Sequence, residues 1–186
     1  MTNTLRIAHI LERSQANGPG ERFVAWTQGC TLACAGCINR SWSWAAESQE
    51  MRNLTPPELL AMIPPDVTGV SLSGGEPMQQ HPETLRRFLQ LCRLRGLSTL
   101  MFSGYSLEEI RQHPERRLAL LYLDVLVAGR FELGKRVQDQ PLIGSTNQQV
   151  HFISKRYSVA DLERVVPMEI KINMDTGTSV KTGITS

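Results

Sequence analysis

The chain has 186 residues, of which 41% are hydrophobic and 20% are charged, and its formal net charge is +2. A chain of this length can bury a core without disulfides, so we expect one domain over residues 1–186. The weak net charge and the absence of a Lys/Arg run do not favour a nucleic-acid partner. The longest apolar stretch, 118–128, is shorter than the ~20 residues of a membrane span, and the N-terminus does not resemble a signal peptide. We therefore expect a cytoplasmic protein with no membrane segment.

Short apolar strands alternate with helices along the chain. Capping boxes begin two of the helices, at Thr55–Glu58 and at Ser106–Glu109, and Gly96 ends another. The expected strands are 22–27, 70–73, 98–102, 125–128 and 150–153, and the expected helices are 55–63, 82–95, one from 106, 114–122 and 158–161. This alternation predicts an α/β fold: an incomplete (β/α) barrel of about five or six parallel strands. Functional loops then lie at the C-terminal ends of the strands.

Residues 168–186 have a different pattern. Residues 169–173 alternate with period two, Asp175-Thr-Gly177 is a turn sequence, and 179–182 can pair back. The pattern predicts a C-terminal β-hairpin extension packed on the edge of the main sheet.

Three cysteines follow the first expected strand closely. Cys30, Cys34 and Cys37 have the spacing C-x3-C-x2-C, on a segment that Gly29 and Gly36 mark as a loop. Thiolates are suitable ligands for iron–sulfur clusters. Three thiolates without a fourth predict a [4Fe–4S] cluster in which one iron is open to a substrate or cosubstrate.

Other interpretations of the cysteines have less support. Structural zinc usually takes four ligands in two pairs, and an electron-transfer ferredoxin needs a fourth cysteine per cluster. Cys92 lies in the apolar pattern of a helix, where we expect a core thiol. The histidines, which are the other candidate ligands, are scattered at positions 9, 81, 113 and 151.

A second candidate loop, Gly74-Gly75-Glu76-Pro77, follows the strand 70–73. Two glycines allow the backbone to approach a ligand closely, and exposed peptide groups with the Glu76 carboxylate can hold an ammonium group. The same residues suit an ordinary turn. The loop follows the cysteines by one β-α-β step, and the combination is more specific than either motif alone.

Together, the cysteine spacing and Gly-Gly-Glu-Pro resemble the radical S-adenosylmethionine (SAM) superfamily. Further segments resemble the activating proteins of anaerobic ribonucleotide reductase within it. These segments are Asn17-Gly-Pro-Gly20, Arg22-Phe-Val24, Thr27-Gln-Gly-Cys30, Asp124-Val-Leu-Val127 and Gly144-Ser-Thr-Asn-Gln148. The matches extend over about residues 5 to 153.

The resemblance implies the cofactors and the chemistry. It implies that Cys30, Cys34 and Cys37 ligate a [4Fe–4S] cluster whose open iron chelates SAM. One electron then cleaves SAM to methionine and a 5′-deoxyadenosyl radical, which removes a hydrogen atom from a glycine of a large glycyl radical enzyme. A flavodoxin or ferredoxin is the expected electron donor.

The resemblance also assigns candidate cofactor-binding residues. Gly74, Gly75 and Glu76 would hold the methionyl amino group, and Ser103, at the end of the next strand, is a candidate for the SAM carboxylate or ribose. Asn39 and Pro77, which adjoin the two motifs, complete the set. No catalytic residue is expected beyond the cluster and the SAM site.

Some residues depart from the pattern of the activating proteins. Ile38-Asn39-Arg40 stands where His-Asn-Pro is frequent, Asn17 replaces a frequent Asp, and Gln149 follows Asn147-Gln148 where Arg is common. Two alternatives therefore stay open: a radical SAM enzyme that modifies a peptide or small metabolite, and a non-catalytic metal-binding or electron-transfer module.

Three other features have competing interpretations. Trp42 and Trp44 either cover the cluster or pack in the core or on the surface. Asp124 either faces the radical site or a partner, or is a satisfied polar residue at a strand end. Asn147 and Gln148 either belong to the site or only shape a loop, with their amides bonded to the backbone.

Overall fold

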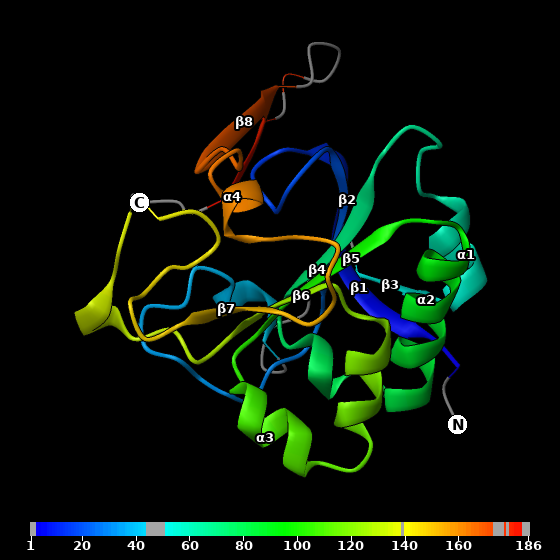
Figure 1. Ribbon diagram of the computed structural model, residues 1–186, viewed down its shortest axis with the longest axis horizontal. Coiled ribbons are helices and arrows are strands. Elements are labelled where there is room, and N and C mark those ends of the chain that lie inside the picture. Colours follow the sequence, from blue (N-terminus) through cyan, green and yellow to red (C-terminus); the bar gives the residue numbers. More distant parts are fainter. Residues whose placement is uncertain (1–2, 44–50, 139, 173–176, 178, 184–186) are drawn as a thin grey trace.

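The computed structural model describes residues 3–43, 51–138, 140–172, 177 and 179–183. A central sheet of seven strands in the order β3-β1-β2-β4-β5-β6-β7 runs through the molecule, and β8 and β9 form a separate pair (Figure 1). Within the described residues, no helix combines the length and the apolar composition needed to cross a bilayer.

The elements have the following bounds. The strands are β1 (Leu5–Ser14), β2 (Arg22–Thr27), β3 (Arg52–Leu54), β4 (Gly69–Gly74), β5 (Ser98–Ser103), β6 (Val125–Ala128), β7 (Gln149–Phe152), β8 (Met168–Ile172) and β9 (Ser179–Gly183). The α-helices are α1 (Pro56–Ala61), α2 (Pro82–Leu94), α3 (Leu107–Gln112) and α4 (Val159–Leu162). The 3-10 helices are η1 (Arg40–Trp42), η2 (Pro77–Gln79), η3 (Arg116–Tyr122) and η4 (Leu133–Lys135).

The fold is mixed α/β with a parallel centre. β2, β4, β5 and β6 pair in parallel, whereas β1 and β3 on one side and β7 on the other are antiparallel. The described sheet thus has four parallel strands where five or six were expected. The expected strand near 150–153 exists as β7, but it runs antiparallel. Among the described residues between β6 and β7, only the short η4 is helical, and the chain re-enters the sheet at the end of the sheet where β6 finishes.

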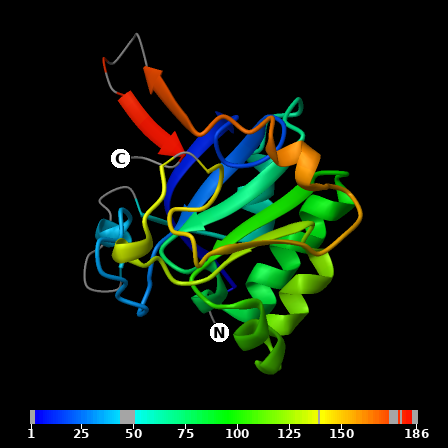
Figure 2. The same cartoon turned by 60° about the vertical axis from the view of Figure 1, so that its left-hand side comes forward.

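The helices α1, α2, α3 and η3 cover one face of the sheet, whereas α4 lies on the other face, where Leu162 packs with Leu100 and Val125 (Figures 1 and 2). α2 presents Leu85, Phe88, Leu89 and Cys92 to the larger core cluster, at the spacing that the sequence predicted. Both predicted capping boxes are present, at α1 and at α3. The segment expected as a helix near 114–122 is the 3-10 helix η3.

Two strands were not among the expected elements. β1 is long but irregular, with register shifts between Ile7 and His9 and between Leu11 and Ser14 in its pairing with β2. These shifts break the two-residue period that identifies a strand in the sequence. β3 has only three residues, none of them buried.

The predicted C-terminal hairpin is confirmed in β8 and β9, which pair antiparallel with Glu169 opposite Thr182. Its predicted position on the edge of the main sheet is wrong, because β8 and β9 form a sheet of their own. Instead, the Glu169 carboxylate accepts hydrogen bonds from Ser14 Oγ (2.7 Å) and from the Gln15 backbone N–H (3.0 Å), just after β1. Of the predicted turn, Asp175 and Thr176 lie outside the described residues.

Candidate cofactor site

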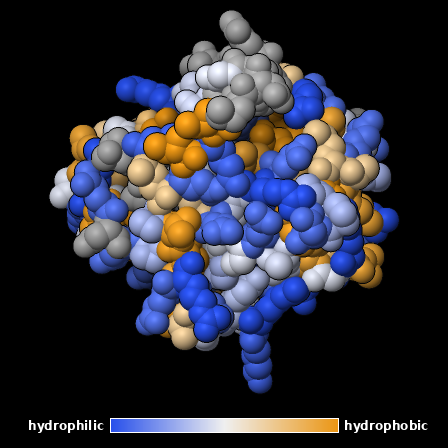
Figure 3. Space-filling model, turned by 90° about the horizontal axis from the view of Figure 1, so that it is seen from above, coloured by the Kyte–Doolittle hydropathy of each residue, from blue (hydrophilic) through white to orange (hydrophobic). Residues whose placement is uncertain are grey.

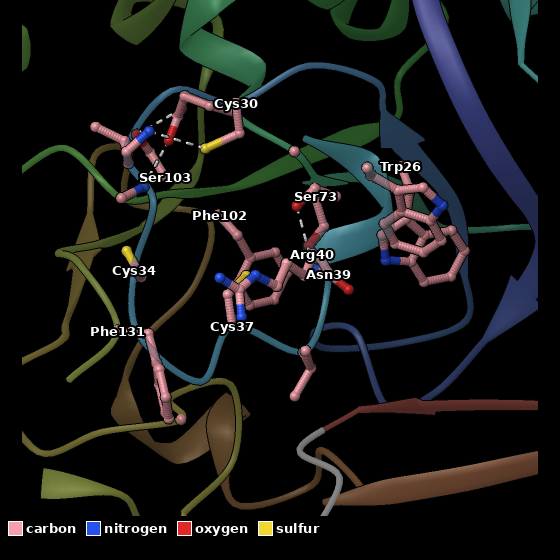
Figure 4. Close-up of a pocket in the computed structure, with 18 of the residues that line it drawn as sticks. Trp26, Cys30, Cys34, Cys37, Asn39, Arg40, Ser73, Phe102, Ser103 and Phe131 are labelled. Atoms are coloured by element: carbon pink, nitrogen blue, oxygen red, sulfur yellow. Dashed lines mark hydrogen bonds between the residues drawn. The ribbon is translucent and has the colours of Figure 1, made fainter. Parts of the chain in front are cut away.

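A cavity of about 850 Å³ adjoins the C-terminal ends of β2, β4 and β5. This volume is in the range that accommodates a small organic cofactor. Figure 4 shows the three cysteines on one loop of its wall, with Ser73, Ser103 and Phe102 on the strand ends beside them. The sequence-predicted residues that line the cavity are Cys30, Cys34, Cys37, Asn39, Gly74, Gly75, Glu76 and Ser103.

The cysteine loop leaves β2 and is fastened to its neighbours by backbone hydrogen bonds. The Gln28 N–H donates to the Arg6 carbonyl, and the Gly29 N–H donates to the Trp42 carbonyl, both at 2.8 Å. Gly29 has a φ of 104° and Gly36 has a φ of 74°, which L-residues with side chains rarely adopt. The two glycines thus allow the turns that return the loop to the cavity.

All three loop cysteines are free, half-buried thiols. Burial raises the pKa of both Cys30 and Cys37, so neither thiol is activated by the protein alone. Backbone N–H groups nevertheless point at the sulfurs: Leu32 donates to Cys30 Sγ at 3.4 Å, and the Asn39 N–H lowers the pKa of Cys37. Such hydrogen bonds stabilise thiolates and tune the potential of iron–sulfur clusters.

The donor set suits an iron–sulfur cluster, because thiolates are its usual protein ligands. Among the described residues, no three His, Cys, Asp or Glu side chains are grouped so that they could hold one metal ion. The thiolates that ligate an iron–sulfur cluster bind separate irons, so they need not converge on one point. Cys92 is fully buried on α2, and burial raises the pKa of its thiol to about 12. Its predicted role as a core thiol is confirmed.

The glycine loop docks directly onto the cysteine loop. The Gly75 N–H donates to the Thr27 carbonyl (2.7 Å), and the Glu76 N–H donates to the Gly29 carbonyl (2.8 Å). A Cβ on Gly75 would lie 2.5 Å from the Gly29 oxygen, and one on Gly74 would lie 2.6 Å from the Thr27 nitrogen. Glycine is therefore needed at both positions because two backbones meet there.

Glu76 is 1% exposed, and its carboxylate is largely satisfied within the chain. Oε1 accepts hydrogen bonds from the Met78 N–H (2.9 Å) and from Ser103 Oγ (2.8 Å), and Oε2 accepts one from the Gly104 N–H (2.7 Å). Burial raises the pKa of Glu76 to about 7, and these hydrogen bonds oppose that rise. A carboxylate has about four acceptor positions, so one is left for a ligand.

Asn39 and Pro77 shape the two loops. Asn39 Nδ2 donates to the Gly74 carbonyl at 3.1 Å, which connects the segment after the cysteines to the end of β4. Pro77 is buried at the first position of η2 and does not line the cavity. Its fixed φ suits the start of a helical turn.

Aromatic residues that the sequence analysis did not assign to the site also line the cavity. Trp26, Phe102 and Phe131 belong to this group. Trp42 lines it as well, with its ring centroid 5.9 Å from that of Trp26, so this tryptophan lies at the site and belongs to neither core cluster. Phe102 directly precedes Ser103 at the end of β5, which is a position that the predicted topology could have identified. Trp44 lies outside the described residues.

The C-terminal hairpin supplies another part of the wall. All five residues of β9 line the cavity, together with Ala16 and Asn17. Asn17 Nδ2 bonds to Thr182 Oγ1 at 2.8 Å and to Ser14 Oγ at 2.9 Å, which fixes β9 beside the cavity. Nothing in the sequence of β9 identifies these residues as part of a site.

The remaining alternatives are resolved by hydrogen bonds. Asp124 is fully buried before β6, at the end of the sheet opposite the cavity, and is bonded to the Thr99 N–H, Ser154 Oγ and Arg93. It is a satisfied polar residue at a strand end. Gln148 Oε1 accepts from the Gly144 N–H, and Asn147 Nδ2 donates to the Arg130 carbonyl. Both amides therefore bond to the loop backbone as predicted, but Gln148 also lines the cavity, and Asn147 Oδ1 is buried without a hydrogen-bond partner.

Comparison with known proteins first defines the class of this chain. The family model described as a 4Fe-4S single cluster domain matches residues 16–151, which include the whole cysteine loop. The chain is therefore a 4Fe–4S cluster protein, in agreement with the three-thiol site.

Individual relatives define the family more closely. The chain is 32% identical to an anaerobic ribonucleoside-triphosphate reductase-activating protein of Pasteurella multocida, over 73% of this chain and 89% of the relative. It is 34% identical to the protein of that description in Haemophilus influenzae, over 73% and 90%. The chain thus belongs to the family of anaerobic ribonucleoside-triphosphate reductase-activating proteins. This confirms the predicted radical SAM family, with a [4Fe–4S] cluster and SAM as the family's cofactors.

A more distant similarity is found among solved structures. The crystal structure of QueE from Escherichia coli matches 55% of this chain and 54% of that chain, with a TM-score of 0.48 and 18% sequence identity.

Proposed function

We propose that this chain is a radical SAM activase that generates a glycyl radical on a partner enzyme, an anaerobic ribonucleotide reductase. The observation that carries the proposal is the single cavity wall on which three free thiols meet the Gly74–Gly75–Glu76 loop. The names of the relatives support the reductase as the partner.

In this proposal the three cysteines bind the cluster and the glycine loop binds SAM. Cys30, Cys34 and Cys37 would hold the cluster through their thiolates. No further described cysteine lines the cavity, so SAM would supply the remaining ligands. When bound, the cluster and SAM supply the one-electron cleavage of a carbon–sulfur bond that gives methionine and a 5′-deoxyadenosyl radical.

The loop after β4 orients the methionyl end of SAM. Gly74 and Gly75 bring its backbone to the cysteine loop, and Glu76 offers its remaining acceptor position to the ammonium group. Ser103 and Asn39 hold Glu76 and the Gly74 carbonyl in place. Pro77 fixes the turn that follows. Positioning of this kind is the main contribution of a protein whose cofactor does the chemistry.

Enclosure is the second task of the chain. The aromatic side chains of Trp26, Trp42, Phe102 and Phe131 cover parts of the cavity wall. Their rings keep water from those parts of the site, where a primary radical would otherwise be exposed to solvent. With the group bound, the chemistry supplied would be transfer of a hydrogen atom from a glycine Cα of the partner, leaving 5′-deoxyadenosine and a glycyl radical.

We extend the proposal to the features that accompany this activity. The parallel strands form the incomplete barrel of a radical SAM domain, and residues 1–186 act as one domain with 168–186 as its hairpin extension. The electron comes from a flavodoxin or ferredoxin, and the protein works in the cytoplasm, where such donors are reduced.

The proposal is tested by mixing the anaerobically reconstituted protein, dithionite and SAM with the large reductase of the same organism. The expected result is a glycyl radical doublet in the electron paramagnetic resonance spectrum of the reductase. Cleavage of SAM without that doublet would contradict the assigned partner and favour a peptide or small metabolite as substrate.

A further inference from the structure

The C-terminal hairpin has its apolar residues on the exposed face. Met168, Ile170 and Ile172 of β8 are 42%, 57% and 63% exposed. Glu169 and Lys171 alternate with them and lie on the opposite face. A strand with one buried face usually has the reverse pattern, with apolar residues toward the protein. We call Met168, Ile170 and Ile172 the hairpin stripe.

The polar face of the hairpin is the one that attaches it to the protein. The Glu169 carboxylate bonds to Ser14 Oγ and to the Gln15 N–H, and Thr182, opposite Glu169, bonds to Asn17. Thr182 is only 4% exposed. Because these contacts hold the hairpin, the stripe is free of any role in attaching it to the seven-stranded sheet.

The hairpin borders the proposed active site. All five consecutive residues of β9 line the cavity, although alternate side chains of a strand point to opposite faces. The cavity is therefore bordered by the edge of β9, and β8 with its stripe lies one strand further out. Figure 3, which looks onto this end of the molecule, shows hydrophobic side chains gathered there.

Exposed apolar residues also occur on the cysteine loop and on η4. Ile38, directly after Cys37, lines the cavity and is 63% exposed. Leu133 of η4 is 53% exposed, and its side chain lies against Gly36. Figure 2 shows η4 and the hairpin on the same side of the molecule. Apolar surface that continues beyond a cavity marks contact with a partner larger than the cavity.

We propose that the hairpin stripe is a docking surface for the protein substrate, whose polypeptide segment enters the cavity past β9. This inference rests on the proposed function and adds the surface that recognises the partner. A small metabolite confined to the cavity would not reach a stripe that lies one strand beyond its border. A folded protein that inserts a loop would cover the stripe with apolar side chains of its own.

The test compares two pairs of substitutions in the full, reconstituted protein. The first is Ile170→Lys with Ile172→Lys, on the stripe. The matched control is Leu94→Lys with Leu121→Lys, at positions on α2 and η3 that are 75% and 70% exposed and do not line the cavity. Affinity for the large reductase is measured by biolayer interferometry, and SAM cleavage is measured without the reductase.

The stripe pair is expected to weaken binding of the reductase by about tenfold or more, because exposed apolar anchors at an interface carry much of its affinity. The control pair is expected to bind within about twofold of the wild type. Cleavage of SAM without the reductase should stay within about twofold in both.

Three results would overturn the inference. One is unchanged affinity in the stripe pair. Another is a wild-type dimer that the stripe pair converts to monomers, which would make a second copy the occupant. The third is a loss of SAM cleavage without the reductase that is as large as the loss of binding. The hairpin would then only form part of the cavity wall. A wild-type protein that cleaves SAM but neither binds nor activates the reductase would contradict the proposed function itself.

Discussion

The two ends of the parallel strands both bury polar groups, but they use them differently. At the N-terminal end, the fully buried Arg22 guanidinium donates to Ser71 Oγ (2.7 Å), Ser98 Oγ (2.9 Å) and the Val70 carbonyl (2.7 Å), and the buried Asp124 is likewise satisfied. At the C-terminal end, three thiols and the backbone of a glycine loop face a cavity. Polar groups that satisfy one another stabilise a fold, whereas groups aimed at a cavity are available for a ligand.

The largest effect is expected from the thiols at the cavity end. Cys30→Ala, Cys34→Ala or Cys37→Ala should each abolish the cluster and SAM cleavage, because a missing thiolate removes one of only three protein ligands. Iron analysis and the absorbance of the reconstituted proteins measure this. Cys92→Ala, in the core, should keep its iron and lose about 1 kcal/mol of unfolding free energy. Loss of the cluster in this variant would refute the ligand assignment.

The second prediction concerns stability and the buried Arg22 at the N-terminal end of the parallel strands. Arg22→Met should lower the free energy of unfolding by about 3 kcal/mol, because it leaves several buried oxygens without their donor. Chemical denaturation measures the change. Arg87→Met, the same substitution at an exposed position of α2, should change it by less than about 0.5 kcal/mol. The Arg22→Met protein that remains folded should still bind its cluster. If the variant is fully folded but binds no cluster, Arg22 also supports the cavity at the opposite end of the strands, which would contradict this account.

A third prediction concerns the contact between the two loops. Gly75→Ala should cost about 1–3 kcal/mol of stability and reduce SAM cleavage by about 100-fold, because the new Cβ pushes the glycine loop away from Gly29. Gly134→Ala is the matched control, since a Cβ there would meet nothing within 4 Å. Equal SAM cleavage in both variants would contradict the role given to the loop contact.

The smallest effect is expected at Ser103. Ser103→Ala removes one of the three hydrogen bonds to Glu76. The loss should lower the free energy of unfolding by about 1 kcal/mol and raise the pKa of Glu76 above about 7. The KM for SAM should rise more than kcat falls, because the serine positions a binding group. Ser103→Thr keeps the hydroxyl and should restore most of the affinity. An unchanged KM in the alanine variant would remove Ser103 from the site.

Many features of the fold could be predicted from the sequence, and those that could not depend on contacts that no local pattern encodes. The cysteine spacing, the capping boxes at Thr55 and Ser106 and the apolar period of α2 are local signals, and the structure contains each of them. The direction of β7 depends on the path of the loop that precedes it, which no local pattern encodes. The strand β1 was not predicted because its irregular pairing with β2 breaks the two-residue period in the sequence.

Prediction of the site residues has the same limit, because it depends on distinctive residue types. The residues of the cysteine and glycine loops were found because their types are chemically distinctive. The contribution of β9 to the cavity was not found, because Ser, Val, Lys, Thr and Gly in a strand have no specific chemistry. The role of Gly75 was also only half predicted: it allows a close approach, and the structure shows that the approaching group is the backbone at Gly29.

The central claim is that the cavity end holds a cluster that cleaves SAM. The most direct test is anaerobic reconstitution with iron and sulfide, followed by dithionite and SAM, with chromatographic measurement of the products. The account predicts an iron–sulfur protein that forms 5′-deoxyadenosine and methionine in equal amounts. Stoichiometric zinc in the purified protein, with no cleavage of SAM after reconstitution, would contradict it.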